Sequence, residues 1–366
     1  MKVYVLGGSV AGLHVAKYIL ASNFDVDVEL YERKKAFGEN IVCAGGIASY
    51  MVKKLKLEIP NEFIAMKIQK IKFYGPSFNH AELKLEREYG LILWRDKWEG
   101  WMGEQIRQLG CKIHLGSKTS NIDFKDADVI VGADGLLGVS RRIIGKKMPE
   151  KHDVHIAIQT VAKSKWLDEE AISMFFGSQT APLGYAWSFP IGGGLFRVGL
   201  GVPLTHANQL LDYYRRLLSS VEAEPVEKPK SKLIPTAYPD KQLTCGKIAL
   251  VGDAGLMTDP STGGGIAPAI IGAKCLAEAL SRGSLKLYDK LWRAELYRRN
   301  KQRYGLKQIL CELSDGDFQV LVDVLKDFKP VSESIGMALI HLLVELAFRN
   351  PRFLTRHKVL RRLMKV

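Results

Sequence analysis

The amino-terminal stretch narrows the possible folds more than any other part of the chain. KVYVLGGSVAGLHVAKYILAS is typical of a buried strand, a glycine turn and a helix, and VDVELYERK indicates a second strand that ends at Glu32. In a dinucleotide-binding βαβ unit, Gly7 makes the tight turn, Gly12 lets the helix pack closely, and an acid about 20 residues on binds a ribose. Ser9 stands where a second glycine is usual, and serine is small enough to be tolerated. An acidic Glu32 would repel a 2′-phosphate, so the pattern predicts an FAD or NAD site.

Two distant stretches favour FAD over NAD. Residues 128–142, DVIVGADGLLGVSRR, read as an apolar strand that enters a Gly-Ala-Asp-Gly turn. Residues 247–280 read as a strand, an Asp-bearing turn, the loop PSTGGG and a long helix that begins near Ile266. Asp253 can hydrogen-bond a ribityl chain, and the amino end of a helix stabilises the negative charge of a reduced flavin. NAD-binding folds need neither feature.

Composition and cysteine usage set further limits. The 366 residues are 47% hydrophobic and 25% charged, which is typical of a globular chain with one large core or two domains. The chain opens directly on a strand without a basic leader, and this predicts a cytoplasmic protein. Five scattered cysteines without a CxxC pair indicate reduced thiols, with neither a disulfide framework nor a metal site.

The net charge of +14 is concentrated at the carboxyl end. The segment RNPRFLTRHKVLRRLMKV, residues 349–366, has seven Lys and Arg residues, no acid, and apolar residues at helical spacing. The apolar stretch IGMALIHLLVELAF before it is too short to span a bilayer. Two interpretations stay open: peripheral attachment to an anionic membrane surface, or a core helix followed by a solvated tail. No nucleic-acid-binding motif is present, so nucleic acid is the weaker candidate partner.

The segment PLGYAWSFP, residues 182–190, combines prolines with aromatic residues. Tyr185, Trp187 and Phe189 alternate as one face of a strand would, whereas prolines withhold amides from a sheet. Taken alone, the segment favours an edge strand whose aromatic side chains fill a core.

These patterns predict an α/β fold with three parts. A Rossmann-like FAD-binding domain comprises residues 1–59, 91–145 and 245–284. An inserted substrate-binding domain, residues 60–90 and 146–244, is mainly antiparallel β, as alternating stretches such as HIAIQTVAKS and LFRVGLGVP indicate. EAEPVEKPKSK within it is expected to be a loop, and residues 285–366 are expected to form a helical carboxyl-terminal region.

Several motifs together resemble a known group of flavoproteins. GGSVAG with Glu32, GADG, and VGDAG with PSTGGGI are similar to the FAD-dependent group that includes para-hydroxybenzoate hydroxylase and the tryptophan halogenases. IVCAGGI at residues 41–47 and PLGYAWSFP resemble the geranylgeranyl reductases of that group, above all the archaeal digeranylgeranylglycerophospholipid reductases. The resemblance covers roughly residues 1–300.

The resemblance implies roles for particular residues. Those expected to contact FAD are Ala11, Glu32, Ala44, Gly46, Arg95, Thr119, Asp253, Gly265 and Ile266, of which Thr119 has only its position in favour. The same motifs add Gly7, Gly8, Ser9, Gly12, Arg33, Gly45, Asp134, Gly135, Pro260, Gly263 and Gly264. Cys43, Tyr185 and Trp187 are the expected catalytic residues, and Tyr185, Trp187 and Phe189 the expected wall of a lipid cavity.

The implied reaction is hydrogenation of C=C bonds in geranylgeranyl chains, by hydride transfer from N5 of reduced flavin. The resemblance also implies that this reaction is a step of membrane lipid biosynthesis. An isoprenoid lipid is the expected substrate, and NAD(P)H, ferredoxin, another electron-donor protein or a deazaflavin is the expected donor. Two alternatives stay open: an aromatic monooxygenase with the same FAD fold, and a non-enzymatic flavoprotein that presents a lipid. The W-x-W-x-I motif of halogenases is absent.

Overall fold

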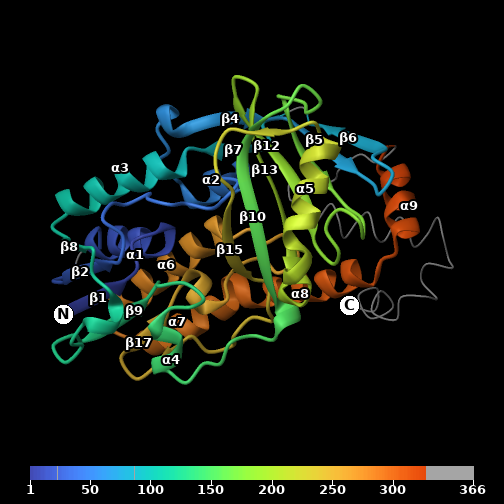
Figure 1. The fold of residues 1–366 in the computed structure, drawn as a ribbon. Helices are drawn as coiled ribbons and strands as arrows, with labels where there is room; N and C mark the ends of the chain where they lie inside the picture. The colour runs from blue at the N-terminus through green and yellow to red at the C-terminus, as the bar shows by residue number, and fades with distance from the viewer. Residues whose placement is uncertain (23, 86, 327–366) are drawn as a thin grey trace. The chain divides into compact units, whose positions relative to one another are not determined.

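The computed structural model describes residues 1–22, 24–85 and 87–326, apart from the Ser120 side chain (Figure 1). The described chain forms two compact units. The first comprises Met1–Ile41, Trp94–Glu150 and Ile234–Gln302, and the second comprises Val42–Leu93, Lys151–Leu233 and the described residues from 303 to 326. The apolar and basic segments expected to contact a membrane, residues 335–348 and 349–366, lie outside the described residues.

The first unit is built on a sheet of six strands in the order β16-β17-β9-β1-β2-β8. All neighbours are parallel except β16 and β17. This is the parallel dinucleotide-binding arrangement that the amino-terminal pattern predicts. The strands are β1 (Lys2–Leu6), β2 (Asp27–Glu32), β8 (Lys112–Leu115), β9 (Val129–Gly132), β16 (Thr244–Cys245) and β17 (Ile248–Leu250).

Helices pack beside this sheet because their apolar faces need cover. Helix α1 contacts both α3 and α6 (Figure 1). Helix α6 begins at Ile266, as the sequence predicts. The elements are α1 (Val10–Leu20), α3 (Arg95–Gln108), α4 (Val139–Ile143), α6 (Ile266–Ser281), α7 (Leu285–Trp292), the 3-10 turns η2 (Thr119–Asn121) and η5 (Gly252–Gly255), and the π-helical turn η6 (Arg293–Tyr297); α8 (Arg298–Glu312) follows.

The second unit contains a large, mainly antiparallel sheet. Its strand order is β14-β10-β13-β12-β11-β5-β6, with β15 also paired to β10. Along this order β11 and β5 run parallel and the other neighbours run antiparallel. A three-stranded sheet, β3-β7-β4, accompanies it. The strands are β3 (Gly46–Ala48), β4 (Ile64–Ile68), β5 (Lys70–Tyr74), β6 (His80–Lys84), β7 (Gly90–Leu93), β10 (Val154–Lys163), β11 (Ala171–Phe175), β12 (Tyr185–Gly192), β13 (Leu195–Pro203), β14 (Glu224–Pro225) and β15 (Lys230–Pro235).

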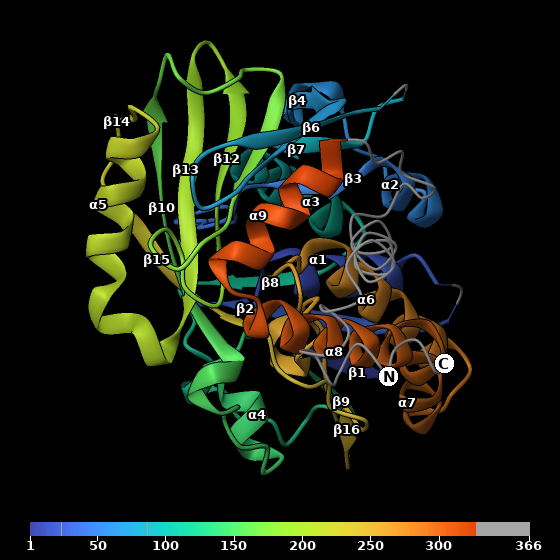
Figure 2. The ribbon, with the colours of Figure 1, turned by 90° about the vertical axis from the view of Figure 1, so that its right-hand side faces the viewer.

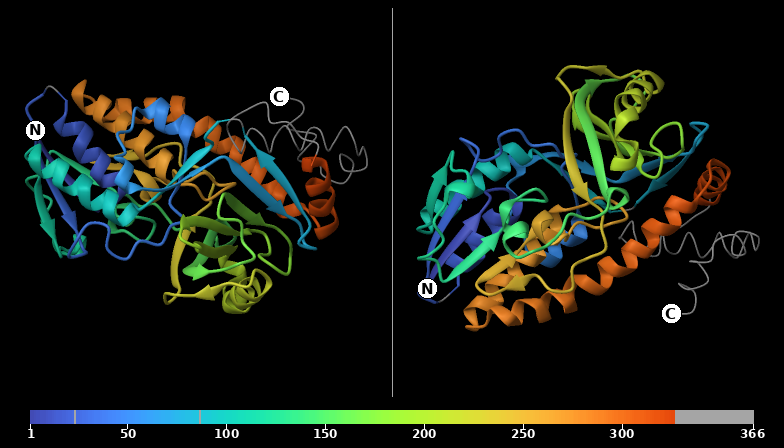
Figure 3. Two further views of the ribbon diagram at one scale, coloured as in Figure 1. Left: turned by 90° about the horizontal axis from the view of Figure 1, so that it is seen from above. Right: turned by 60° about the horizontal axis from the view of Figure 1, so that its bottom comes forward.

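One face of the large sheet forms the core of the second unit. Phe196, Val198 and Leu200 of β13 are fully buried there, together with Leu217 of helix α5. Helix α5 covers β10 and β13 (Figure 2), and helix α9 packs along β6 (Figure 3). The remaining elements are α2 (Ser49–Leu55), α5 (Leu210–Ser220), α9 (Asp315–Lys326), and the 3-10 turns η1 (Asn61–Phe63), η3 (Lys151–Asp153) and η4 (Leu204–Gln209).

The strand formed by PLGYAWSFP differs from the sequence expectation. Strand β12 lies in the interior of the sheet, between β13 and β11, so the prediction of an edge strand was wrong. Pro182 precedes the strand, and the pairing with β13 shifts register between Pro190 and Gly192. A proline beside such an irregularity is tolerated because the regular hydrogen-bond ladder is already interrupted there.

The two units also divide at other residues than the expected domains. Residues 42–59 cluster with the second unit, because β3 pairs with β7 inside the three-stranded sheet. The expected loop 222–232 contains the short strand β14 and the start of β15, both paired to β10. Among residues 1–22, 24–85 and 87–326, no helix combines the length and hydrophobicity needed to cross a membrane.

Candidate functional site

The first glycine motif makes the turn from β1 into α1 in the first unit. Gly7 has φ +104°, and its N–H donates a hydrogen bond to the Tyr31 carbonyl at 2.8 Å. A Cβ atom at residue 7 would collide with the Ala133 carbonyl, and one at residue 12 with the Gly7 carbonyl. Both positions therefore require glycine, for the two reasons the sequence predicts.

Glu32 lies at the carboxyl end of β2 and is hydrogen-bonded to this turn. Its carboxylate accepts hydrogen bonds from the Gly8 N–H at 2.6 Å and the Lys34 N–H at 2.9 Å. Arg33 next to it is exposed. Thr119 begins η2 at the same end of the sheet, where the Ser117 N–H donates to the Glu32 carbonyl at 2.9 Å. Thr119 and Glu32 therefore lie at the same end of the sheet.

The GADG turn lies beside the first motif, since a Cβ atom at residue 7 would also come within 3.0 Å of the Asp134 Cα. The Asp134 carboxylate is hydrogen-bonded to the Ser140 hydroxyl and accepts the Ser140 N–H at 3.1 Å. It therefore fixes the loop that leads into α4. Gly135 has φ +81° and open space where its Cβ atom would stand.

The VGDAG turn also lies beside the first motif. Gly252 has φ +68°, and its Cβ atom would lie 2.8 Å from the Cβ of Ala11. The Asp253 carboxylate accepts a hydrogen bond from the Thr258 hydroxyl at 3.0 Å. A Cβ atom at residue 265 would lie 3.5 Å from an Asp253 carboxylate oxygen. Three separate motifs thus meet at the carboxyl edge of one parallel sheet, where such folds bind their ligands.

The loop before α6 is shaped by its own hydrogen bonds. The Gly263 N–H donates to the Asp259 carbonyl at 2.9 Å, and the Asp259 N–H donates to the Gly264 carbonyl at 3.0 Å. Pro260 is buried within this loop, and Gly263 has φ +70°. Within the described part of the chain, the first turn of α6 carries no acidic side chain, and Gly265 provides no side-chain cap for it.

The amino end of α1 has a related arrangement. Ser9 is the N-cap residue but makes no capping hydrogen bond among the described residues; its hydroxyl donates to Glu99 at 3.0 Å instead. Arg95, the first residue of α3, pairs with Glu99 and donates to the Ser9 hydroxyl at 3.2 Å. Two helix amino ends of positive potential, with a buried arginine beside one, fit the anionic pyrophosphate of a dinucleotide. The described residues at this sheet edge therefore fit FAD.

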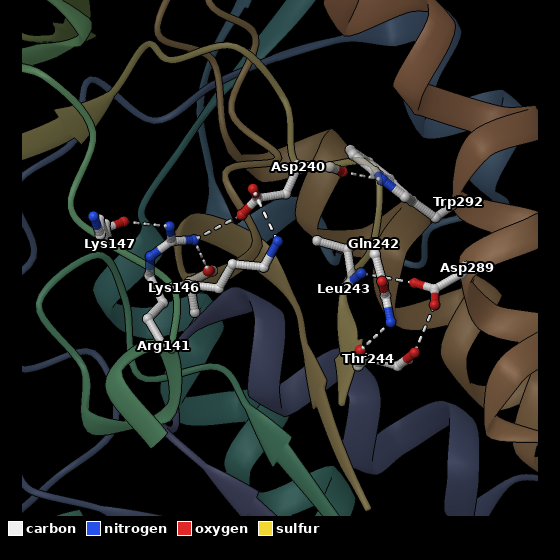
Figure 4. A network of polar contacts seen from close by, with 10 residues as sticks. Arg141, Lys146, Lys147, Asp240, Gln242, Leu243, Thr244, Asp289 and Trp292 are labelled. Atoms are coloured by element: carbon white, nitrogen blue, oxygen red, sulfur yellow. Dashed lines mark hydrogen bonds and ion pairs between the residues drawn. The ribbon is translucent and has the colours of Figure 1, made fainter. Parts of the chain in front are cut away.

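Arg141 is a residue of this region that the sequence analysis missed. Its side chain is buried and donates to the Ala254 carbonyl at 2.7 Å and the Lys147 carbonyl at 2.9 Å (Figure 4). It also pairs with Asp240 at 3.2 Å. Arg141 therefore ties α4, which follows the GADG turn, to the η5 turn that contains Asp253. In the sequence it is one of many arginines, and no local pattern marks it.

The second unit carries the CAGG loop, residues 43–46. The loop folds back on itself, since the Gly45 N–H donates to the Cys43 sulfur at 3.3 Å. Gly45 has φ +84°, and its Cβ atom would lie 2.7 Å from the Leu93 carbonyl. A Cβ atom at residue 46 would lie 2.8 Å from the ring of Phe189. Both glycines are required by close approach, and Phe189 packs directly against the loop.

The aromatic residues of β12 lie on the same face of the sheet. Trp187 is buried, whereas Tyr185 and Phe189 are half-buried. The rings of Tyr185 and Trp187 have centroids 5.7 Å apart, and Phe176 lies 6.2 Å beyond Tyr185. The structure thus brings Cys43, Trp187 and Phe189 into one neighbourhood of the second unit. Phe189 packs against the CAGG loop, and the buried Gln159 hydrogen-bonds both Trp187 and the Cys43 carbonyl.

His155 supports the turn that leads into β12. One ring nitrogen lies 3.1 Å from the Leu183 carbonyl. Burial lowers the pKa of His155 to about 4, so that the ring is neutral in the folded protein and donates this hydrogen bond. No cluster of three or more potential metal-ligating side chains occurs among the described residues.

The comparisons with known proteins agree with this geometry. Residues 153–237 match the family model of the geranylgeranyl reductase catalytic domain. Digeranylgeranylglycerophospholipid reductase of Methanothrix thermoacetophila is 27% identical over 98% of this chain and 99% of its own length. These matches confirm the resemblance to the geranylgeranyl reductases, and with it the predicted enzyme class, an oxidoreductase of that type.

Solved structures show the same fold. A geranylgeranyl bacteriochlorophyll reductase-like protein from Thermoplasma acidophilum superposes with a TM-score of 0.87, at 24% identity and with 98% of each chain covered. A variant of HpxO from Klebsiella pneumoniae, in complex with FAD, superposes with a TM-score of 0.68 at 16% identity, covering 90% of this chain and 95% of its own. The predicted α/β fold of this flavoprotein group is therefore confirmed.

Proposed function

We propose that this protein is an FAD-dependent reductase that hydrogenates C=C bonds of geranylgeranyl chains in lipids. The single observation that carries the proposal is the meeting of the three glycine motifs in the first unit, on a chain that resembles digeranylgeranylglycerophospholipid reductase along its length. The relatives' names supply the substrate class, an isoprenoid lipid. The glycine cradle supports the cofactor.

The residues of the first unit are proposed to hold FAD. The amino ends of α1 and α6 and the Arg95 guanidinium bind the pyrophosphate, and Glu32 binds a ribose. Asp253 binds the ribityl chain. When bound and reduced, FAD supplies a hydride from N5 to one alkene carbon, while a proton reaches the other carbon.

The residues of the second unit are proposed to act on the lipid. Protonation of one carbon of an unactivated alkene places positive charge on the other carbon, which then receives the hydride. The faces of Tyr185 and Trp187 stabilise such a charge and exclude water without presenting an anion that would trap it. Their rigid rings also bind a prenyl chain at low entropic cost. Cys43 positions the loop that meets the reacting carbon atoms and is a candidate for proton delivery.

One experiment separates this proposal from the monooxygenase alternative. The bound flavin is reduced with dithionite, the excess is removed, and a geranylgeranyl glycerophospholipid is added without oxygen. Recovery of the oxidised flavin absorbance, with a saturated lipid product, is the expected result. Flavin that stays reduced until oxygen is admitted would instead support the monooxygenase. A non-enzymatic flavoprotein would bind the lipid without any turnover.

The electron donor and membrane contact remain separate proposals. NAD(P)H, ferredoxin and a deazaflavin each suit a flavin that is reduced in a step distinct from lipid reduction. Peripheral attachment to anionic lipid, proposed from the basic segment 349–366, is tested by sedimentation with vesicles that contain or lack an anionic phospholipid. Binding only to the anionic vesicles is expected.

A further inference from the structure

Gln159 is a buried polar residue in the middle of an apolar strand. It lies on β10, with 8% of its surface exposed. In the sheet register Gln159 stands opposite Gly199 of β13, and Gly199 stands opposite Trp187 of β12. The three residues therefore form one row across three strands, on the sheet face opposite to the core beneath α5.

The glycine in the middle of this row lets its two neighbours meet. A Cβ atom at residue 199 would lie 2.8 Å from Cζ2 of Trp187. Gly201, one step along the same face, would place its Cβ atom 3.8 Å from Cζ3 of the same ring. The indole therefore lies flat across the backbone of β13 and reaches β10. Side chains normally meet those of the adjacent strand, whereas β10 is two strands away from β12.

The side-chain amide of Gln159 makes two different hydrogen bonds. Its oxygen accepts the indole N–H of Trp187 at 3.1 Å, and its nitrogen donates to the Cys43 carbonyl at 3.2 Å. An indole only donates and a carbonyl only accepts, so the amide has one orientation that satisfies both. No single side chain without both a donor and an acceptor can replace it.

Three successive carbonyls of the CAGG loop accept hydrogen bonds from neighbouring strands. Gln159 binds the Cys43 carbonyl, Arg197 donates to the Ala44 carbonyl at 2.9 Å, and the Leu93 N–H donates to the Gly45 carbonyl at 3.0 Å. Arg197 also donates to the Leu93 carbonyl at 2.9 Å. Gln159 also binds a side chain assigned to the reaction, the indole of Trp187.

We propose that Gln159 is a positioning residue that couples the indole of Trp187 to the backbone of the Cys43 loop. The consequence for catalysis rests on the roles proposed above for Trp187 and Cys43. Movement of the indole is transmitted through one rigid amide to the Cys43 carbonyl. The aromatic wall and the loop therefore adopt their working positions together.

The test measures the reactivity of Cys43 in the purified protein without substrate. N-ethylmaleimide labelling is followed by mass spectrometry, resolved to individual cysteines. Gln159→Leu removes both hydrogen bonds and is expected to label Cys43 about tenfold faster, because the part-buried Cys43 carbonyl loses its partner and the loop loses a restraint. Labelling of the buried residues Cys111 and Cys275 is expected to stay at the wild-type rate.

Three further variants separate coupling from simple loss of stability. Thr160→Val removes a buried side-chain hydroxyl from β10. This hydroxyl donates to the Glu227 carbonyl at 2.6 Å and lies on the sheet face opposite to Gln159. It is expected to leave Cys43 labelling unchanged. Trp187→Phe keeps a ring but removes the indole N–H, and is expected to accelerate Cys43 labelling. The Gln159→Leu, Trp187→Phe double variant is expected to label no faster than Gln159→Leu alone.

Three results would overturn the inference. These are an unchanged Cys43 rate in Gln159→Leu, an equal acceleration in Thr160→Val, and additive effects of the Gln159 and Trp187 substitutions. Because the labelling needs no turnover, a wild-type protein that reduces no lipid would contradict the proposed function and leave this test intact.

Discussion

Gly252 lies against Ala11 so closely that a Cβ atom at residue 252 would stand 2.8 Å from the Cβ of Ala11. Ala11 belongs to the first turn of α1, and Gly252 opens the turn that carries Asp253. The contact therefore joins two motifs that are more than half the chain apart in sequence. It also explains why the VGDAG motif needs glycine at residue 252.

Gly252→Ala is expected to lower the free energy of unfolding by about 2 kcal/mol, because it adds a crowded methyl group to a positive-φ position. FAD affinity is expected to fall as well, measured by flavin fluorescence titration. Gly246→Ala is the matched control: Gly246 has φ +55° and nothing within 4 Å of the added atom. Its cost should be about 1 kcal/mol, with FAD affinity unchanged. Equal effects of the two substitutions would contradict the packing argument.

Glu32→Ala is expected to raise the dissociation constant for FAD about tenfold, because a ribose acceptor is lost and the Gly8 and Lys34 amides lose theirs. Glu32→Gln retains an acceptor oxygen and should lose less. Lys35→Ala truncates an exposed neighbour and serves as the control. If Glu32→Ala binds FAD like Lys35→Ala, then Glu32 does not contact the nucleotide.

Arg141→Met is expected to lower the free energy of unfolding by about 3 kcal/mol, since a buried cation is removed from two carbonyls and from Asp240. Lys146 stays paired with Asp240 at 3.2 Å, which limits the loss. Arg142→Met alters the exposed arginine next to it and should change stability little. Urea denaturation checks both variants. Similar midpoints for the two would show that the network in Figure 4 contributes no such stability.

Burial lowers the pKa of His155 from 6.5 to about 4. Between these pH values the unfolded chain binds a proton that the folded chain does not, so stability falls as the pH is lowered through this window. His155→Gln should reduce this slope by up to about 1.4 kcal/mol per pH unit. Urea unfolding measured between these pH values tests the prediction. An unchanged slope would mean that His155 is protonated in the folded state.

Local sequence was sufficient for the parts of the fold that short segments determine. The glycine turn after β1, Glu32 at the end of β2, and the start of α6 at Ile266 all follow from strand, turn and helix signals within a few residues. The convergence of the three motifs was expected from the resemblance, and the structure places them at one sheet edge.

Sequence failed where distant residues decide the outcome. The position of β12 inside its sheet depends on pairing with both β13 and β11, which no pattern in PLGYAWSFP reveals. Glu99, Arg141 and Arg197 bind partners that are 90 or more positions away in the sequence. Gln159 left one faint signal, a single amide among apolar residues on a strand that reads HIAIQTVAK, but its two partners are visible only in the folded unit.

The most direct test of the account is the mass of the lipid after a single anaerobic turnover. Protein with dithionite-reduced FAD is mixed with a geranylgeranyl glycerophospholipid, and the lipid is extracted and weighed by mass spectrometry. The account predicts that the lipid gains two hydrogen atoms for each double bond reduced, with one equivalent of flavin oxidised per bond. Lipid of unchanged mass, while the same protein binds FAD and is reduced normally, would contradict it.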